Sequence, residues 1–395
     1  MKESELENWR EISFQEGRGC ILEVDLEYPK ELHNLHNDYP LAPERIVVNK
    51  VEKLLPNLWD KNKYVLHHRN LKQYLEMGMI LMKIHHGVSF DEDALLKPYI
   101  EMNTKLRTEA SNEFEKDFFK VMNNSVFGKT MENIRNSVDI RLRTDDKSAE
   151  KLVSKPNYER TTIFTEYLVA VHMKKTELVF NKPVYLGMSI PDISKTLMFD
   201  FHHNFIKKMY GPKAKLLMTD TDSLMYEIHT EDFFEDIRKH SKLFLDTSNI
   251  ENSKLPRLNK KVPGKFKDEA GGKIISEVVG LRSKSYAFDM DGDEFKKCKG
   301  VKKNVVNKEI TLNDYKNCLF SGRQQLRPMN VIRSHHHEVF TEQVNKIALS
   351  ADDDKQIILL DRIHTRMRTD REAQGKAEGP WGGEFLCNFW ASLRS

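Results

Sequence analysis

The chain has 395 residues, of which 39% are hydrophobic and 31% are charged, and its formal net charge at pH 7 is +3. These values fit a globular protein of two or three domains and exclude a polycation. The four cysteines lie far apart, which excludes zinc-ribbon spacing and a dense disulfide framework, so we expect a reducing, intracellular compartment. No apolar run approaches the ~20 residues that span a bilayer, and no membrane partner is expected.

The N-terminal half predicts a strand, then helices, then strands. Residues 19–29, GCILEVDLEYP, predict a strand that Pro29 ends. Residues 70–84 predict a helix or a helix followed by a strand, and residues 95–134 follow a helical pattern. Residues 161–173 predict a strand or a buried hairpin.

The C-terminal half predicts mainly hairpins. Residues 194–211 predict a helix that Gly211 ends, and residues 216–228 predict two apolar strands joined by a polar turn. A further helix is expected over residues 233–246, and two strands around an Asp-Gly turn over residues 276–295. This order predicts an α+β fold with a mainly antiparallel sheet.

The helical stretch at residues 115–134 has two different faces. One face is expected to carry Lys120, Asn124, Phe127, Gly128 and Met131. The opposite face is expected to be core and carries Phe118, Phe119, Met122 and Val126. A glycine within a helix costs about 1 kcal/mol against alanine, so Gly128 indicates a close approach. A lysine can hold a phosphate and an aromatic ring can stack on a base. The alternative is an ordinary amphipathic helix with a polar outer face.

Two carboxylates, Asp220 and Asp222, sit at the turn of LLMTDTDSLMYEI, residues 216–228. Asp, Thr and Ser are common turn residues, so a plain turn is one interpretation. Two carboxylates about 4 Å apart repel by roughly 4 kcal/mol at an effective dielectric constant of about 20. A divalent cation such as Mg²⁺ removes that repulsion, so a metal site is the other interpretation.

A run of six lysines without an acidic residue occupies residues 295–308, FKKCKGVKKNVVNK. Such a run suits contacts with a phosphate backbone. A solvated surface is the alternative.

Three motifs occur in an order that resembles family B DNA polymerases. K-x-x-x-N-S-x-F-G at 120–128 is similar to motif B of that family, with Phe127 where tyrosine is usual. D-T-D-S at 220–223 is similar to motif C, and Lys284-Ser285-Tyr286 to the K-x-Y motif that follows it. The phrases NNSVFGKTMENIRN and GCILEVDLEYP resemble the protein-primed branch, of Maverick/Polinton transposon or viral-like type. The resemblance spans residues 15–365.

The resemblance implies a right-hand polymerase architecture with an antiparallel palm sheet, helical fingers and a small thumb, without an exonuclease domain. It places palm-adjacent strands and an insertion that follows motif A at 1–95, the fingers with motif B at 96–143, the palm with motif C and K-x-Y at 144–295, and the thumb at 296–365. Residues 366–395 lose periodicity and are expected to form a divergent, disordered tail.

The implied activity is DNA-directed DNA polymerisation with Mg²⁺ or Mn²⁺. The implied partners are a DNA template and primer, deoxynucleoside triphosphates and, as a candidate primer, a terminal protein. The nucleus or a virus-like particle is the implied location. The resemblance assigns metal ligation and catalysis to Asp222 and Asp220, nucleotide binding to Lys120, Asn124, Phe127 and Gly128, and DNA binding to Lys284, Tyr286, Lys302 and Lys303.

One implied carboxylate is missing. Motif A of the family reads D-x-x-S-L-Y-P and supplies a further metal ligand. Asp25 in VDLEYP is the remaining candidate, but Tyr28 follows it by three residues instead of five. We therefore expect VDLEYP to follow motif A in longer relatives, and this chain to be a C-terminal fragment with weak or no activity. A catalytically dead nucleic-acid-binding relic and a metal-dependent nuclease remain as alternatives.

Overall fold

A computed structural model describes Trp9 and residues 17–48, 50–239, 244–250, 256–260, 262–335, 338–352, 356–358, 365–367 and 386–393. The chain divides into two compact units. The first unit comprises Met1–Ala94, Pro191–Met329 and Asn345–Ser395, and the second comprises Leu95–Ile190 and Asn330–Val344.

A three-stranded antiparallel sheet opens the first unit. Its order is β4 (Lys61–His67), β1 (Arg18–Glu27), β5 (Ile80–Asp91). Side chains alternate along β1: Cys20, Leu22, Val24 and Leu26 are buried, and the acidic residues between them are not. The predicted strand at residues 19–29 is therefore confirmed. The helix α4 (His68–Glu76) directly precedes β5, which confirms the helix followed by a strand.

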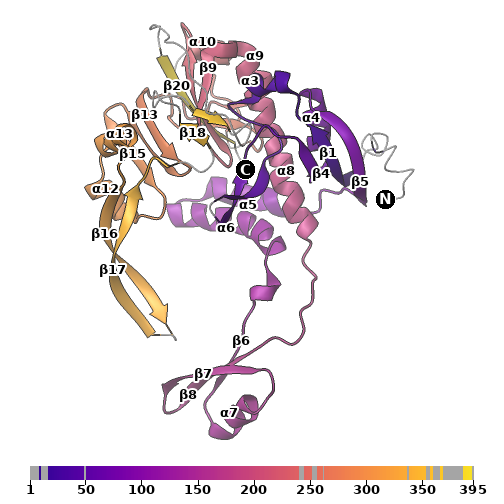
Figure 1. Cartoon of the computed structure of the whole chain (residues 1–395), viewed down its shortest axis with the longest axis vertical. Helices are drawn as coiled ribbons and strands as arrows, with labels where there is room; N and C mark the ends of the chain where they lie inside the picture. The colour runs from indigo at the N-terminus through magenta and orange to yellow at the C-terminus, as the bar shows by residue number, and fades with distance from the viewer. Residues whose placement is uncertain are drawn as a thin grey trace. The chain divides into compact units, whose positions relative to one another are not determined.

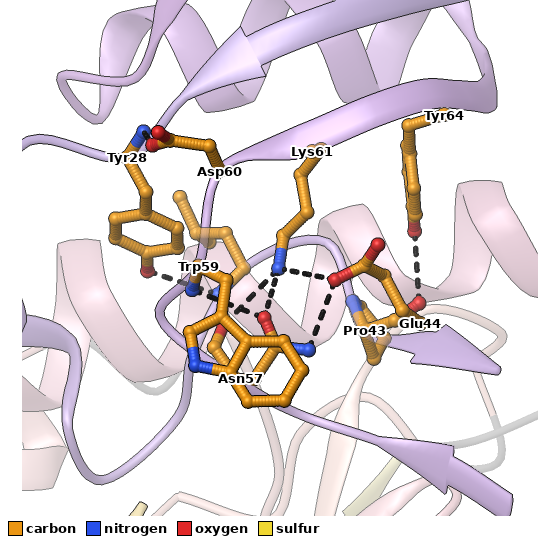
Figure 2. A network of polar contacts seen from close by, with 9 residues as sticks. Tyr28, Pro43, Glu44, Asn57, Trp59, Asp60, Lys61 and Tyr64 are labelled. Carbon is orange, nitrogen blue, oxygen red and sulfur yellow. Dashed lines mark hydrogen bonds and ion pairs between the residues drawn. The ribbon is translucent and has the colours of Figure 1, made fainter. Parts of the chain in front are cut away.

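Short elements connect β1 to β4: η1 (Lys30–Leu32), α3 (His33–His36), β2 (Glu44–Val48) and β3 (Val51–Leu55). A polar network ties this connection to the start of β4 (Figure 2). The Lys61 ammonium is fully buried and contacts the carboxylate of Glu44 at 2.9 Å and the side chain of Asn57. The backbone N–H of Tyr28 donates to Asp60, and the Tyr28 hydroxyl accepts the N–H of Leu41.

A five-stranded sheet forms the second core of the first unit (Figure 1). Its order is β11 (Leu245–Asp246), β12 (Phe266–Asp268), β20 (Leu386–Leu393), β10 (Ser223–His229), β9 (Ala214–Asp220). The pairs are antiparallel except β11 with β12. A continuous helical segment precedes β9: α8 (Val184–Phe199), a π-helix η3 (Asp200–Ile206), α9 (Lys207–Tyr210) and η4 (Gly211–Lys213). The α-helical part of this segment ends at Tyr210, directly before Gly211 (φ 55°), as the sequence predicts, and a single 3₁₀ turn follows.

A second antiparallel sheet follows, with β13 (Ile275–Arg282), β14 (Ser285–Met290) and β15 (Asp293–Cys298) in that order. The predicted Asp-Gly turn joins β14 to β15, with positive φ at Asp291 and Gly292. Two helices, α12 (Lys303–Glu309) and α13 (Leu312–Ser321), share a buried core with the sheet. Two hairpins come next: β16 (Gln325–His335) with β17 (Glu338–Leu349), and β18 (Gln356–Ile358) with β19 (Thr365–Met367).

The second unit contains a helix pair and a small sheet. The helices are α5 (Lys97–Glu109) and α6 (Glu113–Thr130), joined by a hydrogen bond from the Tyr99 hydroxyl to the Met122 carbonyl. After η2 (Ile134–Asn136), the strands β6 (Asp139–Arg143), β8 (Leu168–Met173) and β7 (Tyr158–Thr165) form a sheet in that order, and α7 (Asp146–Val153) packs on it (Figure 1). This confirms the hairpin at residues 161–173.

Three expectations about individual elements are corrected. Of the helix expected over residues 233–246, α10 covers Phe233–Arg238, residues 240–243 lie outside the described residues, and Leu245 and Asp246 form β11 instead of helix. Residues 276–295 form three strands, because the chain also turns at Lys284, where φ is 60°. Residues 386–393 form β20 in the tail expected to lack order, since β-formers such as Phe and Trp are dense there. Residues 368–385 and 394–395 of that tail lie outside the described residues.

The fold mixes helices with mainly antiparallel strands, in agreement with the α+β prediction. Within the part of the chain that the structure describes, no helix combines the length and apolarity that crossing a membrane requires.

Candidate active site

The β9–β10 hairpin turns within two residues, Thr221 and Asp222. Asp220 is the last residue of β9 and pairs with Ser223, the first residue of β10. The N–H of Asp222 donates to the Asp220 carbonyl at 2.7 Å, and the Ser223 hydroxyl donates to the same oxygen at 3.1 Å. Thr221 has φ 61°, a conformation that β-branched residues rarely adopt. Such local strain is typical of functional sites.

Buried apolar side chains hold β10 behind this turn. Leu224, Met225 and Tyr226 are fully buried, and each belongs to one of two core clusters. The Tyr226 hydroxyl shares a 2.9 Å hydrogen bond with His202 Nδ1 on the π-helix. The apolar strand therefore fixes the turn, while Asp222 lies exposed at its tip.

Lys284 and Tyr286 lie beside the hairpin. The Lys284 ammonium is 3.4 Å from Asp220 Oδ1. Tyr286 is buried in the cluster that contains Met225, and its ring lies 6.3 Å from the ring of Phe288 in a near-parallel stack. Burial raises the pKa of the Tyr286 hydroxyl, so that hydroxyl stays protonated at neutral pH. The structure thus brings the D-T-D-S and K-x-Y motifs together.

Lys297 also contacts Asp220, and the sequence did not single it out from its lysine run. Its ammonium lies 3.2 Å from Asp220 Oδ2 and 5.8 Å from the centre of the Tyr286 ring. Partial burial raises the pKa of Asp220, but the hydrogen bond and charge of Lys297 and the charge of Lys284 outweigh it, so that pKa is lowered. Asp220 is therefore ionised at neutral pH. Strand alternation in β15 is the only sequence signal that separates Lys297 from Lys296.

The residues of the K-x-x-x-N-S-x-F-G motif all lie on α6 in the second unit. Lys120, Asn124, Phe127 and Gly128 are exposed on this helix. A Cβ built on Gly128 would meet no atom within 4 Å among the described residues. The face is therefore open to an external ligand, and Gly128 adds to that space.

The expected core face of α6 is only partly correct. Phe119, Met122 and Val126 are half-buried, but the side chain of Phe118 is 48% exposed. Phe118 stacks on the exposed ring of Phe114 one turn earlier, at 6.5 Å. Helical periodicity placed Phe118 on the apolar side, but within the second unit no described element covers it.

Asp25 lies on β1, and both of its carboxylate oxygens contact other residues of the protein. Its Oδ1 accepts the N–H of Lys63 at 2.8 Å, and its Oδ2 lies 2.8 Å from His85 Nε2. The hydrogen bond from the Lys63 backbone is the main cause that lowers the pKa of Asp25. Among the described residues, no group of close metal-type ligand atoms combines Asp25 with Asp220 and Asp222.

One group of such ligand atoms does occur in the described ranges, in His67, His68 and Glu92, within 4.8 Å of one another. The Nδ1 atoms of His67 and His68 accept the N–H groups of Arg69 and Cys20. Glu92 lies 3.3 Å from His67 Nε2 and 2.7 Å from the Arg69 guanidinium. These contacts form a closed network of hydrogen bonds and ion pairs at the start of α4, which gives the group a structural role.

Lys303 is the first residue of α12, and Lys302 directly precedes it as the N-cap residue. Both side chains are exposed. They belong to the first unit, as do Asp220, Lys284 and Tyr286.

Residues 21–208 match the model of a family described as DNA polymerase type B, organellar and viral. This segment, which is slightly less than half of the chain, is similar to the type B DNA polymerases. The family match includes the α6 motif and ends before the β9–β10 hairpin. The protein-primed resemblance seen in the sequence falls within this group.

Among solved structures, the chain is similar to phi29 DNA polymerase complexed with primer–template DNA and incoming nucleotide substrates. The identity is 16% and the TM-score 0.47, and the match covers 84% of this chain. The chain spans about half the length of that polymerase, since 51% of it is covered. A comparison with curated proteins found no match.

Proposed function

We propose that this chain is a DNA-directed DNA polymerase module that carries out templated nucleotidyl transfer. One observation carries the proposal: the D-T-D-S hairpin has its Asp220 held by the lysine of the K-x-Y segment, in a chain whose residues 21–208 match the type B polymerase model. Family and geometry are independent here, because the family match ends before the hairpin. The proposed partners are a DNA template and primer and deoxynucleoside triphosphates, with a terminal protein as candidate primer.

The proposed architecture is a right hand. It assigns the fingers to residues 96–143, the palm to residues 144–295 with the segment before 96 beside it, and the thumb to residues 296–365. We assign no exonuclease domain to these 395 residues. The similarity of the phrases NNSVFGKTMENIRN and GCILEVDLEYP to transposon-type polymerases supports an origin in a mobile element, for which the nucleus or a virus-like particle is the proposed place of action.

The hairpin carboxylates fit a hard divalent cation such as Mg²⁺ or Mn²⁺. Asp222 is exposed at the tip, Asp220 is ionised one residue before the turn, and carboxylate oxygens are the ligands that such ions prefer. Two divalent cations bound here would lower the barrier to phosphoryl transfer by stabilising the attacking and leaving oxygens. Asp25 is bonded to Lys63 and His85 and supplies no third ligand in this arrangement. A third carboxylate ligand would therefore have to be a residue other than Asp25, Asp220 and Asp222.

The remaining roles follow the motifs. Lys120 would neutralise the triphosphate, Asn124 and Phe127 would line the nascent base pair, and Gly128 would leave room for it. Phe127 keeps the ring of the usual tyrosine and lacks its hydroxyl, so it can stack but cannot donate a hydrogen bond. Lys284 and Tyr286 would hold the primer end.

Primer extension by the purified chain with Mg²⁺ or Mn²⁺ tests the proposal. Asp222→Asn is expected to lower the extension rate by at least about 100-fold, because it removes a charged metal ligand. Asp91→Asn, at an exposed carboxylate on β5, is the matched control and should leave the rate unchanged. Extension by the wild-type chain is expected to be weak, because Asp25 supplies no third ligand, and extension that survives in Asp222→Asn would contradict the proposal. DNA binding without extension would favour the inactive relic, and cleavage without nucleotides the nuclease.

Lys120→Ala is expected to raise the KM for deoxynucleoside triphosphates by about tenfold or more, because a phosphate contact is worth roughly 1.5–3 kcal/mol. Lys129→Ala is the control, since Lys129 lies on the opposite side of α6 and pairs with Glu132 at 2.9 Å. Steady-state kinetics at saturating DNA measures both variants. Equal KM values for the two variants would remove Lys120 from the nucleotide site.

A further inference from the structure

Each carboxylate oxygen of Asp220 faces a different ammonium group. Lys284, from the β13–β14 turn, lies 3.4 Å from Oδ1, and Lys297, from β15, lies 3.2 Å from Oδ2. The side chain of Asp220 is 18% exposed, whereas both lysines are about half exposed. Lys284 belongs to the K-x-Y motif, and no motif of the sequence accounts for Lys297.

Lys297 is held in place by the sheet around it. It pairs with Tyr286 across β14 and β15, and its ammonium lies over the Tyr286 ring. The buried Tyr315 of α13 donates its hydroxyl hydrogen to the Lys297 carbonyl at 2.9 Å. These contacts place the Lys297 ammonium as an ion-pair partner of Asp220.

The neighbouring lysine has a different partner. Lys296 pairs with Glu294 at 3.1 Å, on the opposite side of the strand from Lys297 because side chains alternate along β15. The two adjacent lysines thus lie in the same lysine run of the sequence but pair with different carboxylates. Only one of them contacts a candidate metal ligand.

An ammonium on Oδ2 and a divalent cation compete for the same lone pairs of Asp220. Two positive charges about 5 Å apart also repel each other, by an amount that solvent reduces but does not abolish at a half-exposed site. Lys297 therefore weakens cation binding at the hairpin, and it keeps Asp220 anchored when no cation is bound.

We propose that Lys297 is a positioning residue that holds Asp220 Oδ2 and sets the affinity of the β9–β10 hairpin for divalent cations. The inference rests on the proposed function only in taking Asp220 and Asp222 as the cation ligands. In this arrangement Lys284 fixes one oxygen, Lys297 is the exchangeable partner of the other, and Asp222 is the ligand that meets the cation first.

Mn²⁺ binding to the full chain, measured from the electron paramagnetic resonance signal of free Mn²⁺, tests the inference without any turnover. Lys297→Met is expected to tighten Mn²⁺ binding by about three- to tenfold, because it frees Oδ2 and removes one repelling charge. Lys297→Arg keeps the charge and should restore near wild-type affinity. Lys296→Met is the matched control and should change the affinity by less than twofold.

Unchanged or weaker Mn²⁺ binding in Lys297→Met would overturn the inference, as would a wild-type chain without Asp222-dependent Mn²⁺ binding. Lys297→Gln, with a similar length and no charge, serves if the methionine variant does not fold. The outcome is separate from that of the proposed function. A chain that binds Mn²⁺ with this lysine dependence but never extends a primer keeps the inference and loses the polymerase proposal.

Discussion

Lowering the pH from 7 to about 4 is expected to destabilise the first unit by several kcal/mol. The cause is a group of three neighbouring imidazoles: those of His36 and His202 are buried, and that of His203 is half-buried. The ring of His203 lies 4.7 Å from that of His36 and 4.6 Å from that of His202. Burial lowers the pKa of His36 from 6.5 to about 4 and that of His203 to about 3, and it lowers the pKa of His202 well below 6.5.

The hydrogen bonds of these rings do not outweigh the effect of burial. His36 contacts the Tyr28 hydroxyl at 2.8 Å. The Tyr39 carbonyl, 3.1 Å from His203, raises the pKa of that ring, but burial and the charge of His36 lower it by more. The nearby Lys207 adds positive charge, which its ion pair with Asp38 at 2.6 Å partly offsets.

The imidazoles of the unfolded chain take up protons near pH 6.5 and the folded rings do not. The contribution of these rings to the free energy of unfolding is therefore fully present above pH 6.5. It is lost as the pH falls toward 4 and below. A shift of the size given for His36 corresponds to roughly 3 kcal/mol.

Urea unfolding followed by tryptophan fluorescence between pH 7.5 and 4 measures this loss. The second unit contains no tryptophan, so the signal reports on the first unit alone. His203→Gln keeps a donor for the Tyr39 carbonyl. It should lower the number of protons taken up on unfolding, which sets the slope of the unfolding free energy against pH, by about one. His86→Gln, at an exposed histidine on β5, is the control and should leave the slope unchanged. Equal slopes in wild type and His203→Gln would exclude this origin of acid sensitivity.

Lys61→Met is expected to destabilise the first unit by about 2–4 kcal/mol. The Lys61 side chain is fully buried, and its ammonium contacts Glu44 at 2.9 Å and the Asn57 carbonyl at 3.4 Å (Figure 2). Removal of one member of a buried ion pair typically costs 3–5 kcal/mol, because the other charge loses its partner. The expected value is lower here, since the Glu44 side chain is 25% exposed and can regain some water.

A double-mutant cycle separates the ion pair from packing. Glu44→Gln combined with Lys61→Met should cost less than the sum of the two single changes, because no unpaired charge remains. Lys63→Met, two residues further along β4 at an exposed position, is the control. If Lys61→Met unfolds at the same urea concentration as Lys63→Met, the network of Figure 2 contributes little to stability.

Local patterns predicted the elements with strong periodicity. Alternation of apolar and polar residues predicted β1, and an apolar–polar–apolar run predicted the β9–β10 hairpin. Gly211 predicted the end of the helix before it. Long-range pairing was not predictable in this way. The place of β20 between β10 and β12 depends on partners far away in the sequence, and neither propensity nor pattern contains that information.

The candidate site shows the same division. The motifs singled out Asp220, Asp222, Lys284 and Tyr286, which the structure brings together. Lys297 was hidden in a lysine run, because charge composition does not tell which side chain faces a partner. Phe118 was misplaced for a related reason, since a helical wheel gives the face of a residue but not what covers it.

The position of β20 has a consequence for the order in which the first unit can form during synthesis. Tyr226 of β10 pairs with Phe389, and Lys267 of β12 pairs with Ser392. The central position of the five-stranded sheet therefore stays empty until residues 386–393 have left the ribosome. Until then β10, which carries the Asp222 turn at its start, presents an open edge that can pair with other chains. Such late, non-local closure is slow, which makes nascent and C-terminally shortened chains the forms most exposed to misassembly.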